Sequence, residues 1–223
     1  MAQVMDHEKI IAQFELFDHE ARDLNAWGRK AVDLCAKWYV RVANTLGMEE
    51  QLTNRTLTLV LRPFPGTART DPRTGEITFS SQYLRRSPQD LGIVIHELTH
   101  ALQAFGTNQP FLSGSPTWQP AKAQDAWLTE GIAEYVRLTL FEPEVPPPRI
   151  NPDLARYTDS YQTTATFLRW VAKYKQPNLV VQLNQQLQAG TYFLGSFQQI
   201  TGQPVDLLWT EFLEIVRARK LVL

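Results

Sequence analysis

Apolar residues recur every three or four positions along much of the chain, a period that predicts amphipathic helices. The clearest early case is residues 18–46, where the apolar stripe runs up to Gly47, a residue typical of helix ends. The apolar positions of this stripe are Leu24, Trp27, Ala31, Leu34, Trp38 and Val42. Residues 5–17 fit neither the helical nor the strand period well and are left open between the two.

Two short segments have the pattern of strands instead. Residues 56–63 are rich in β-branched and apolar side chains and end in a proline-containing stretch, which predicts a strand. A polar stretch follows, and then residues 71–75 have the composition of a tight turn. That turn leads into a second predicted strand at residues 76–80.

The second half of the chain is predicted to be mainly helical. Ser87 followed by Pro88 predicts an N-cap and a first helical turn, and this helix would continue to a stop at Gly106. A loop is expected over 107–122, a helix over 123–141, and a rigid proline-rich connector after it. Further helices are predicted at 160–174, 178–187, 192–200 and 204–219. This order of a helix, a small sheet and then helices predicts the α+β class.

These elements predict one domain over residues 1–223. It would contain a helix and sheet subdomain at about 1–105 and a helical subdomain at about 123–223.

Composition and charge exclude several functional classes. The chain has 223 residues, a formal net charge of −1, and 22 basic and 23 acidic side chains without a basic cluster, so no nucleic-acid partner is expected. No apolar run approaches the roughly 20 residues that span a bilayer, so no membrane partner is expected either. The start of the chain lacks a signal-peptide pattern, which predicts a cytoplasmic protein, or a secreted one if a leader has been removed. The single cysteine, Cys35, lies among apolar residues and is expected in the core.

The candidate chemistry lies in the segment HELTH, residues 96–100. In a helix, His96 and His100 lie on one face, one turn apart, where both imidazoles can reach a single metal ion. Glu97 lies beside them and is placed to take a proton from a water that the metal activates. The other two histidines, His7 and His19, lie in polar surroundings and are read as surface residues.

A catalytic zinc site usually needs a third protein ligand. A third histidine in the pattern HExxHxxGxxH would require Gly at 103 and His at 106, but those positions hold Gln103 and Gly106. Cys35 on the early helix is a poor candidate, which leaves a carboxylate.

The strongest candidate carboxylates are Glu130 and Glu134, four residues apart in the apolar segment WLTEGIAEYV. We hypothesise that Glu130 binds the metal and that Glu134 accepts the free N–H of a ligating histidine. Gly131, next to the ligand, would let a neighbouring helix approach closely. The alternative is an exposed acidic pair on a solvated helix face.

The segments HELTH and WLTEGIAEYVRL together resemble the zincin metallopeptidases that have a glutamate as third ligand. More narrowly, the chain resembles the basic secretory protein family, which comprises peptidases of plants and bacteria. The segments YQTTATFLRWV, FQQITGQPVDLLW and GEITFSSQYL are similar to further blocks of that family. The chain differs in having no basic character or visible secretion signal, in having Glu134 where Asp is common, and in the long loop that follows Gly106.

This resemblance implies a zincin-like fold, with a small mixed sheet whose edge strand lies beside the HExxH helix. It also implies a zinc-dependent endopeptidase, with Zn²⁺ held by His96, His100 and Glu130 and with Glu97 as general base. Tyr161 is the candidate donor to the oxyanion, although it could equally pack on a helix surface. Chain order and the resemblance together suggest that residues Ile77, Thr78, Phe79 and Ser80 form the edge strand that pairs with an extended peptide or protein substrate.

Two other functional classes stay open. One is a metal-dependent hydrolase with a non-peptide substrate, and the other is an inactive binding module on the same fold. The presence of Glu97 argues against the inactive module. Trp118 and Trp127 are candidates to line the cleft, although core packing is the better expectation for Trp127.

Overall fold

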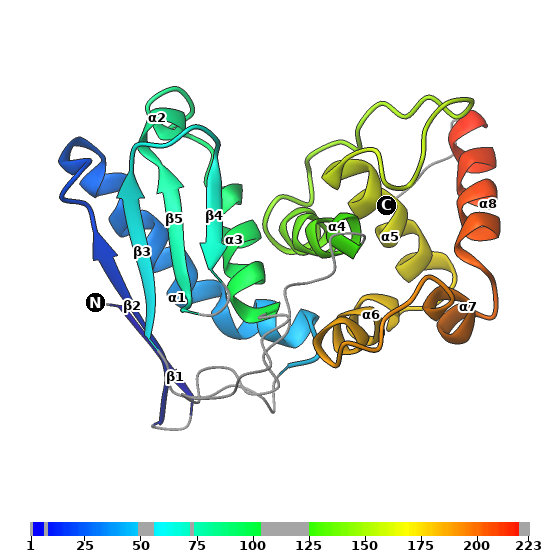
Figure 1. The fold of residues 1–223 in the computed structure, drawn as a ribbon, viewed down its shortest axis with the longest axis horizontal. Coiled ribbons are helices and arrows are strands. Elements are labelled where there is room, and N and C mark those ends of the chain that lie inside the picture. Colours follow the sequence, from blue (N-terminus) through cyan, green and yellow to red (C-terminus); the bar gives the residue numbers. More distant parts are fainter. Residues whose placement is uncertain (1, 7–8, 49–55, 72–73, 104–124, 219–223) are drawn as a thin grey trace. The chain divides into compact units, whose positions relative to one another are not determined.

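The computed structural model describes residues 2–6, 9–48, 56–71, 74–103 and 125–218 (Figure 1). The protein has a mixed α+β architecture, as the order of elements in the sequence predicts. The chain divides into two compact units, Met1–Trp118 and Gln119–Leu223, and the single-domain reading stays a prediction. Among the described helices, none has the combination of length and apolar composition that a membrane-spanning segment requires.

The first unit contains a five-stranded mixed sheet, built from the described residues in the order β1-β2-β3-β5-β4. Strands β2, β3 and β5 run parallel to their neighbours within this central part of the sheet. Strand β1 pairs antiparallel with β2 at one end, and β4 pairs antiparallel with β5 at the other. The strands are β1 Ala2–Asp6, β2 Lys9–Phe17, β3 Thr56–Arg62, β4 Ala68–Asp71 and β5 Glu76–Ser80.

Helices α1 (Asn25–Thr45) and α3 (Gly92–Gln103) cover one face of this sheet (Figure 1). The contact of α1 with the sheet is close at Gly28, where an added Cβ would come within 2.8 Å of a methyl group of Leu16. The helix predicted over 18–46 is therefore confirmed, with a short 3-10 turn, Arg22–Leu24, in front of it. It ends before Gly47, whose φ of 69° is readily adopted only by glycine.

Three of the five strands in the described residues are not assigned by the sequence pattern. The open segment 5–17 contains the end of β1 and all of β2, and the polar stretch before the predicted turn contains β4. Residues 72 and 73 of the predicted turn lie outside the described residues, but the N–H of Gly75 donates to the carbonyl of Asp71 at 2.8 Å, as a turn over 71–75 requires. Residues 68–71 pair antiparallel with β5.

The prediction that residues 77–80 form the sheet edge is therefore wrong. Strand β5, which includes Ile77, Thr78, Phe79 and Ser80, lies between β3 and β4. The edge on this side of the sheet, as far as the structure describes it, is β4.

The start of the HELTH helix also differs from the prediction. Ser87 and Pro88 belong to a turn in which the N–H of Asp90 donates to the carbonyl of Ser87 at 3.1 Å. Helix α3 begins at Gly92, where Asp90 Oδ1 accepts the N–H of Ile93 at 3.3 Å. Asp90 thus caps the helix in place of Ser87. The predicted stop at Gly106 and the loop over 107–122 lie outside the described residues.

The second unit, as far as it is described, is helical. The helix predicted over 123–141 corresponds to α4 (Ala126–Val136), followed by a wider π-helical turn, η4 (Arg137–Phe141). The later predictions correspond to the remaining helices, with the short one displaced by a few residues. These helices are α5 Tyr161–Tyr174, α6 Leu179–Gln188, α7 Ser196–Thr201 and α8 Val205–Arg217.

Aromatic rings form the centre of this second unit. Phe167 of α5 is fully buried, and its ring packs against those of Phe197 and Phe212, with centroids 6.4 and 5.7 Å apart. Trp127 is partly exposed, and its ring stacks on that of buried Phe197 at 6.3 Å, so it packs against this core and is not enclosed by it.

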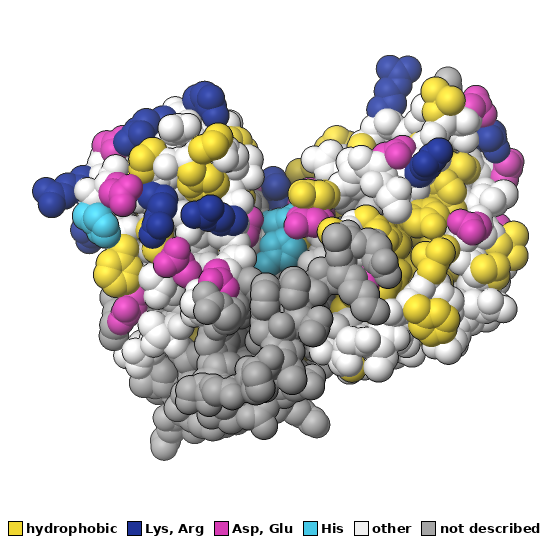
Figure 2. Space-filling view, viewed as in Figure 1, with side chains coloured by type: hydrophobic (Ala, Val, Ile, Leu, Met, Phe, Trp, Pro, Cys, Tyr) yellow, Lys and Arg dark blue, Asp and Glu magenta, His cyan; other side chains and the backbone are white. Residues whose placement is uncertain are grey.

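Charged and large apolar side chains are distributed differently on the surface of the described residues. On the face drawn in Figure 2, basic and acidic side chains are interspersed on each unit. Large apolar side chains are also exposed, and of the described ones all but Phe17 belong to the second unit. They are Val145, Leu154, Tyr161, Tyr174, Phe193, Leu194 and Leu207.

Candidate metal centre

Helix α3 carries the HELTH segment and is almost entirely buried. Every residue of the helix is buried except His100, which is partly exposed. A helix that is buried on all sides is normally apolar, because a polar side chain without a partner is costly to remove from water. His96, Glu97 and His100 therefore need specific partners.

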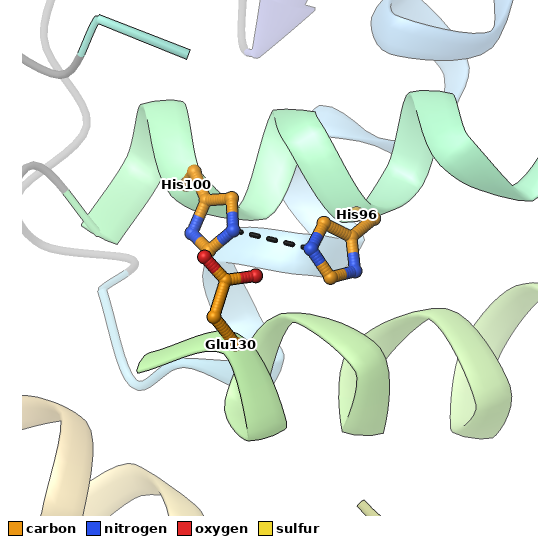
Figure 3. Close-up of side chains that lie close together, drawn as sticks. All are labelled: His96, His100 and Glu130. Atoms are coloured by element: carbon orange, nitrogen blue, oxygen red, sulfur yellow. Dashed lines mark hydrogen bonds between the residues drawn. The ribbon is translucent and has the colours of Figure 1, made fainter. Parts of the chain in front are cut away.

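His96 and His100 face each other across one turn of α3 (Figure 3). Their Nε2 atoms are 3.2 Å apart, and their ring planes meet at 79°. Two nitrogens that bind one tetrahedral zinc ion at about 2.0–2.1 Å are separated by roughly 3.3 Å. The histidine pair thus already has the separation that a shared metal ion requires.

Gln103 fixes the orientation of His100 from the other side of the ring. Its Oε1 lies 2.9 Å from Nδ1 of His100, and the Gln103 side chain is buried. A carbonyl oxygen can only accept a hydrogen bond, so this contact favours the tautomer that has the proton on Nδ1 and the lone pair on Nε2. This is the tautomer in which Nε2 can bind a metal, and a partner of this kind commonly supports a metal-binding histidine.

Glu97 is also buried, with 5 % of its surface exposed, and its partner comes from the sheet. The hydroxyl of Thr70, on strand β4, lies 2.7 Å from Glu97 Oε2 and 3.1 Å from the main-chain oxygen of the same residue. The carboxylate next to His96 therefore receives a hydrogen bond from a residue 27 positions earlier in the chain.

Glu130 lies on α4, whose position against α5 depends on the next residue. A Cβ added to Gly131 would lie 2.1 Å from Cγ2 and 2.7 Å from Cβ of Thr164, so the two helices are too close here for any larger residue. Thr164 is itself held in place, because its hydroxyl donates to the carbonyl of Tyr157 at 2.6 Å. The close helix approach expected at Gly131 is present, and α5 is the helix that approaches.

The three residues expected to be ligands form one group (Figure 3). One ligand atom from each of His96, His100 and Glu130 can be chosen so that all three lie within 4.8 Å of one another. His96 is buried and the other two are partly exposed. Two imidazoles and one carboxylate are a donor set typical of catalytic zinc sites. This group could therefore hold a metal ion.

Glu134 is buried on α4, with its Oε2 3.9 Å from a guanidinium nitrogen of Arg137. Arg137 also binds Glu142, across the π-helical turn, at 2.7 Å. The alternative of an exposed acidic pair does not apply to Glu134, because only 4 % of its surface is accessible. Its role in orienting a histidine stays a prediction.

The structure also describes the positions of three other residues considered in the sequence, Tyr161, Cys35 and His19. Tyr161 is the first residue of α5 and is 52 % exposed, so its role as an oxyanion donor also stays a prediction. Cys35 is fully buried, which raises the pKa of its thiol and agrees with a core position. His19 is exposed, whereas His7 and Trp118 lie outside the described residues.

We expect replacement of Gly131 by Ala to destabilise the protein by about 1–3 kcal/mol, because the added methyl group overlaps Thr164. Denaturant unfolding of both proteins would measure the loss. In the control, Thr164→Ser removes the nearest carbon but keeps the hydroxyl. Adding Thr164→Ser to the Gly131→Ala variant should recover part of the lost stability. A Gly131→Ala variant as stable as the original protein would contradict the close helix contact.

Sequence reasoning missed two partners of the site, Thr70 and Gln103. A signal for each was present. A tight turn at 71–75 that leads into a strand usually has a second strand before it, which would have pointed to residues 68–71. Gln103 follows His100 by three residues, a spacing that places both on one helix face.

Comparison with known proteins agrees with the resemblance noted from the sequence. A family model described as a peptidase of plants and bacteria matches residues 31–212. No curated protein and no solved structure matches the chain. The matched region covers most of the chain and contains Thr70, the HELTH segment and Glu130. The chain therefore belongs to this family of peptidases of plants and bacteria.

Proposed function

We propose that this protein is a zinc-dependent endopeptidase with a zincin-like fold. The observation that carries the proposal is the group of His96, His100 and Glu130, together with the buried carboxylate of Glu97 adjacent to His96. Membership in a peptidase family supports hydrolysis of peptide bonds as the reaction.

His96, His100 and Glu130 would hold the zinc ion. The 3.2 Å separation of the two Nε2 atoms fits ligands of one cation, and the Gln103 contact leaves Nε2 of His100 able to bind it. When bound, zinc polarises the scissile carbonyl and lowers the pKa of the attacking water.

Glu97 would act as general base and then as general acid. Its carboxylate accepts a proton from the attacking water as the new C–O bond forms. It then gives that proton to the amine nitrogen as the C–N bond breaks, so the carboxylate is restored at the end of the cycle. Tyr161 is retained as the candidate hydrogen-bond donor to the oxyanion, and Glu134 as the residue that orients a ligating histidine.

The substrate would bind as an extended strand along β4. Within the described residues, this strand forms one edge of the sheet. Its residue Thr70 hydrogen-bonds to Glu97 of the HELTH helix. An edge strand presents unpaired main-chain groups that a peptide can bind by adding a strand. Pairing with the substrate, which was expected of residues 77–80, is thus proposed for β4.

Metal analysis and substrate comparison test this function. We expect purified protein to contain close to one zinc ion per chain and to hydrolyse a mixed peptide library. Activity should disappear with a chelator and return when zinc is added. Hydrolysis of small esters without hydrolysis of peptides would favour the non-peptide hydrolase. Zinc binding without any turnover would favour the inactive binding module.

A further inference from the structure

The position of Thr70 in the sheet places its hydroxyl beside the carboxylate of Glu97. In the strand register, Thr70 pairs with Ile77, Ile77 pairs with Leu59, and Leu59 pairs with Leu16. Paired residues project from the same face of a sheet, so these four form one row across it. Leu16 marks this face as the one that α1 covers, because it contacts the Cβ position of Gly28. Thr70 is the single polar member of the row, and it is the member nearest the edge.

The hydroxyl of Thr70 has one proton to donate, and two oxygens of Glu97 lie within reach. The carboxylate oxygen Oε2 is at 2.7 Å and the main-chain oxygen at 3.1 Å. A hydrogen bond to a charged acceptor is shorter and stronger than one to a neutral acceptor. The proton therefore goes to Oε2, and the main-chain oxygen is left to its hydrogen bond within α3.

This contact restricts the carboxylate of Glu97 in a way that suits proton transfer. With Oε2 held by Thr70, the side chain cannot rotate freely, and Oε1 is the oxygen left to exchange a proton with the attacking water. A base that is held in one orientation stays within hydrogen-bond reach of the proton it accepts, on which efficient transfer depends. Without the hydroxyl, the same carboxylate would sample several orientations.

We propose that Thr70 is a positioning residue that orients the general base Glu97 from the edge strand of the sheet. This inference rests on the proposed function. It extends that function by assigning Oε2 of Glu97 to the sheet and Oε1 to the reaction. The strand that we expect to bind the substrate then also holds the base, so Thr70 links the two parts of the site through one short element.

Three single variants test the proposal. Thr70→Val keeps the size and the strand preference of the side chain but removes the hydroxyl. Thr70→Ser keeps the hydroxyl and removes a methyl group. Thr78→Val is the matched control, because Thr78 Oγ1 donates to Glu76 Oε1 at 3.0 Å on the opposite face of the same sheet. It removes a threonine–glutamate hydrogen bond of the same kind away from α3.

We expect Thr70→Val to lower kcat about 10- to 100-fold, the effect of losing one hydrogen bond to a charged group, with KM within about twofold of the original. The zinc content should not change, because Thr70 hydrogen-bonds to Glu97 and is not one of the three expected ligands. Thr70→Ser and Thr78→Val should keep kcat within about twofold of the original. Full activity of Thr70→Val would overturn the proposal, and so would loss of zinc from it or failure of Thr70→Ser to retain activity.

A structural measurement separates this inference from the proposed function. Crystal structures of the metal-free Thr70→Val and Thr70→Ser variants should show the Glu97 carboxylate rotated in the first and unchanged in the second. An unchanged carboxylate in Thr70→Val would contradict the positioning role. If the original protein hydrolyses no peptide, the proposed function fails, but these two structures still show whether Thr70 orients Glu97.

Discussion

Replacement of Glu97 by Gln is expected to abolish peptide hydrolysis and to leave zinc bound. Glutamine has nearly the same shape as glutamate but cannot accept the proton of the attacking water. General-base catalysis typically contributes 10²–10⁴-fold, so kcat should fall by about that factor. The metal should stay, because the expected ligands are His96, His100 and Glu130. Peptide turnover and metal analysis on the same preparation would measure both effects.

The control for this variant is Glu20→Gln, which makes the same chemical change at an exposed position of the first unit. It should match the original protein in both measurements. Unchanged turnover of Glu97→Gln would remove Glu97 as the base. Loss of zinc from Glu97→Gln would mean that this carboxylate belongs to the ligand set, contrary to the proposal.

Replacement of Glu130 by Gln is expected to weaken zinc binding more than 100-fold and to abolish activity at low zinc concentration. Removal of a residue that only supports a ligand already costs about 10–100-fold in affinity, so loss of a ligand should cost more. Because bound zinc stabilises the folded state, a chelator should lower the Tm of the original protein. The Glu130→Gln variant should show little of this change. Competition with a chromophoric chelator would give the affinities directly.

Glu144→Gln is the matched control, because Glu144 is exposed in the same unit and has the same side chain. It should bind zinc as the original protein does. If Glu130→Gln binds zinc with unchanged affinity, Glu130 is not a ligand, and the proposed metal site is wrong. Glu97→Gln and Glu130→Gln should therefore lose activity for different reasons. The first loses the base and keeps the metal, and the second loses the metal.

Elements with long, regular patterns could be predicted from the sequence. The apolar stripe that gives α1 spans five turns, and β3 and β5 are dense in β-branched and apolar residues, so local sequence was sufficient for them. The candidates His96 and His100 followed from helix geometry, because residues four apart share a face, and Glu97 followed from its place beside His96 in the same motif. Glu130 followed from its position in an apolar helix, where a carboxylate calls for an explanation.

Other features depend on contacts between distant parts of the chain. Strand β4 has the polar sequence ARTD, typical of an edge, and only its pairing with β5 makes it a strand. The turn at 71–75 points to a strand before it, but the contact of Thr70 with Glu97 also depends on how that strand pairs with β5 and packs against α3, which local sequence does not specify. The start of α3 was misjudged for a similar reason. Both Ser87 and Asp90 are good capping residues, and the turn formed around Pro88 decides between them.

Strand β4 is only four residues long and, within the described part of the sheet, is hydrogen-bonded to a neighbour along one side. Elements held in this way open locally at a smaller free energy than the whole protein needs to unfold. Each opening would carry Thr70 away from Glu97 while the rest of the sheet stays folded. The contact between Thr70 and Glu97 is therefore expected to open at a lower free energy than the whole fold. A peptide bound along β4 would raise the free energy of this local opening towards that of global unfolding.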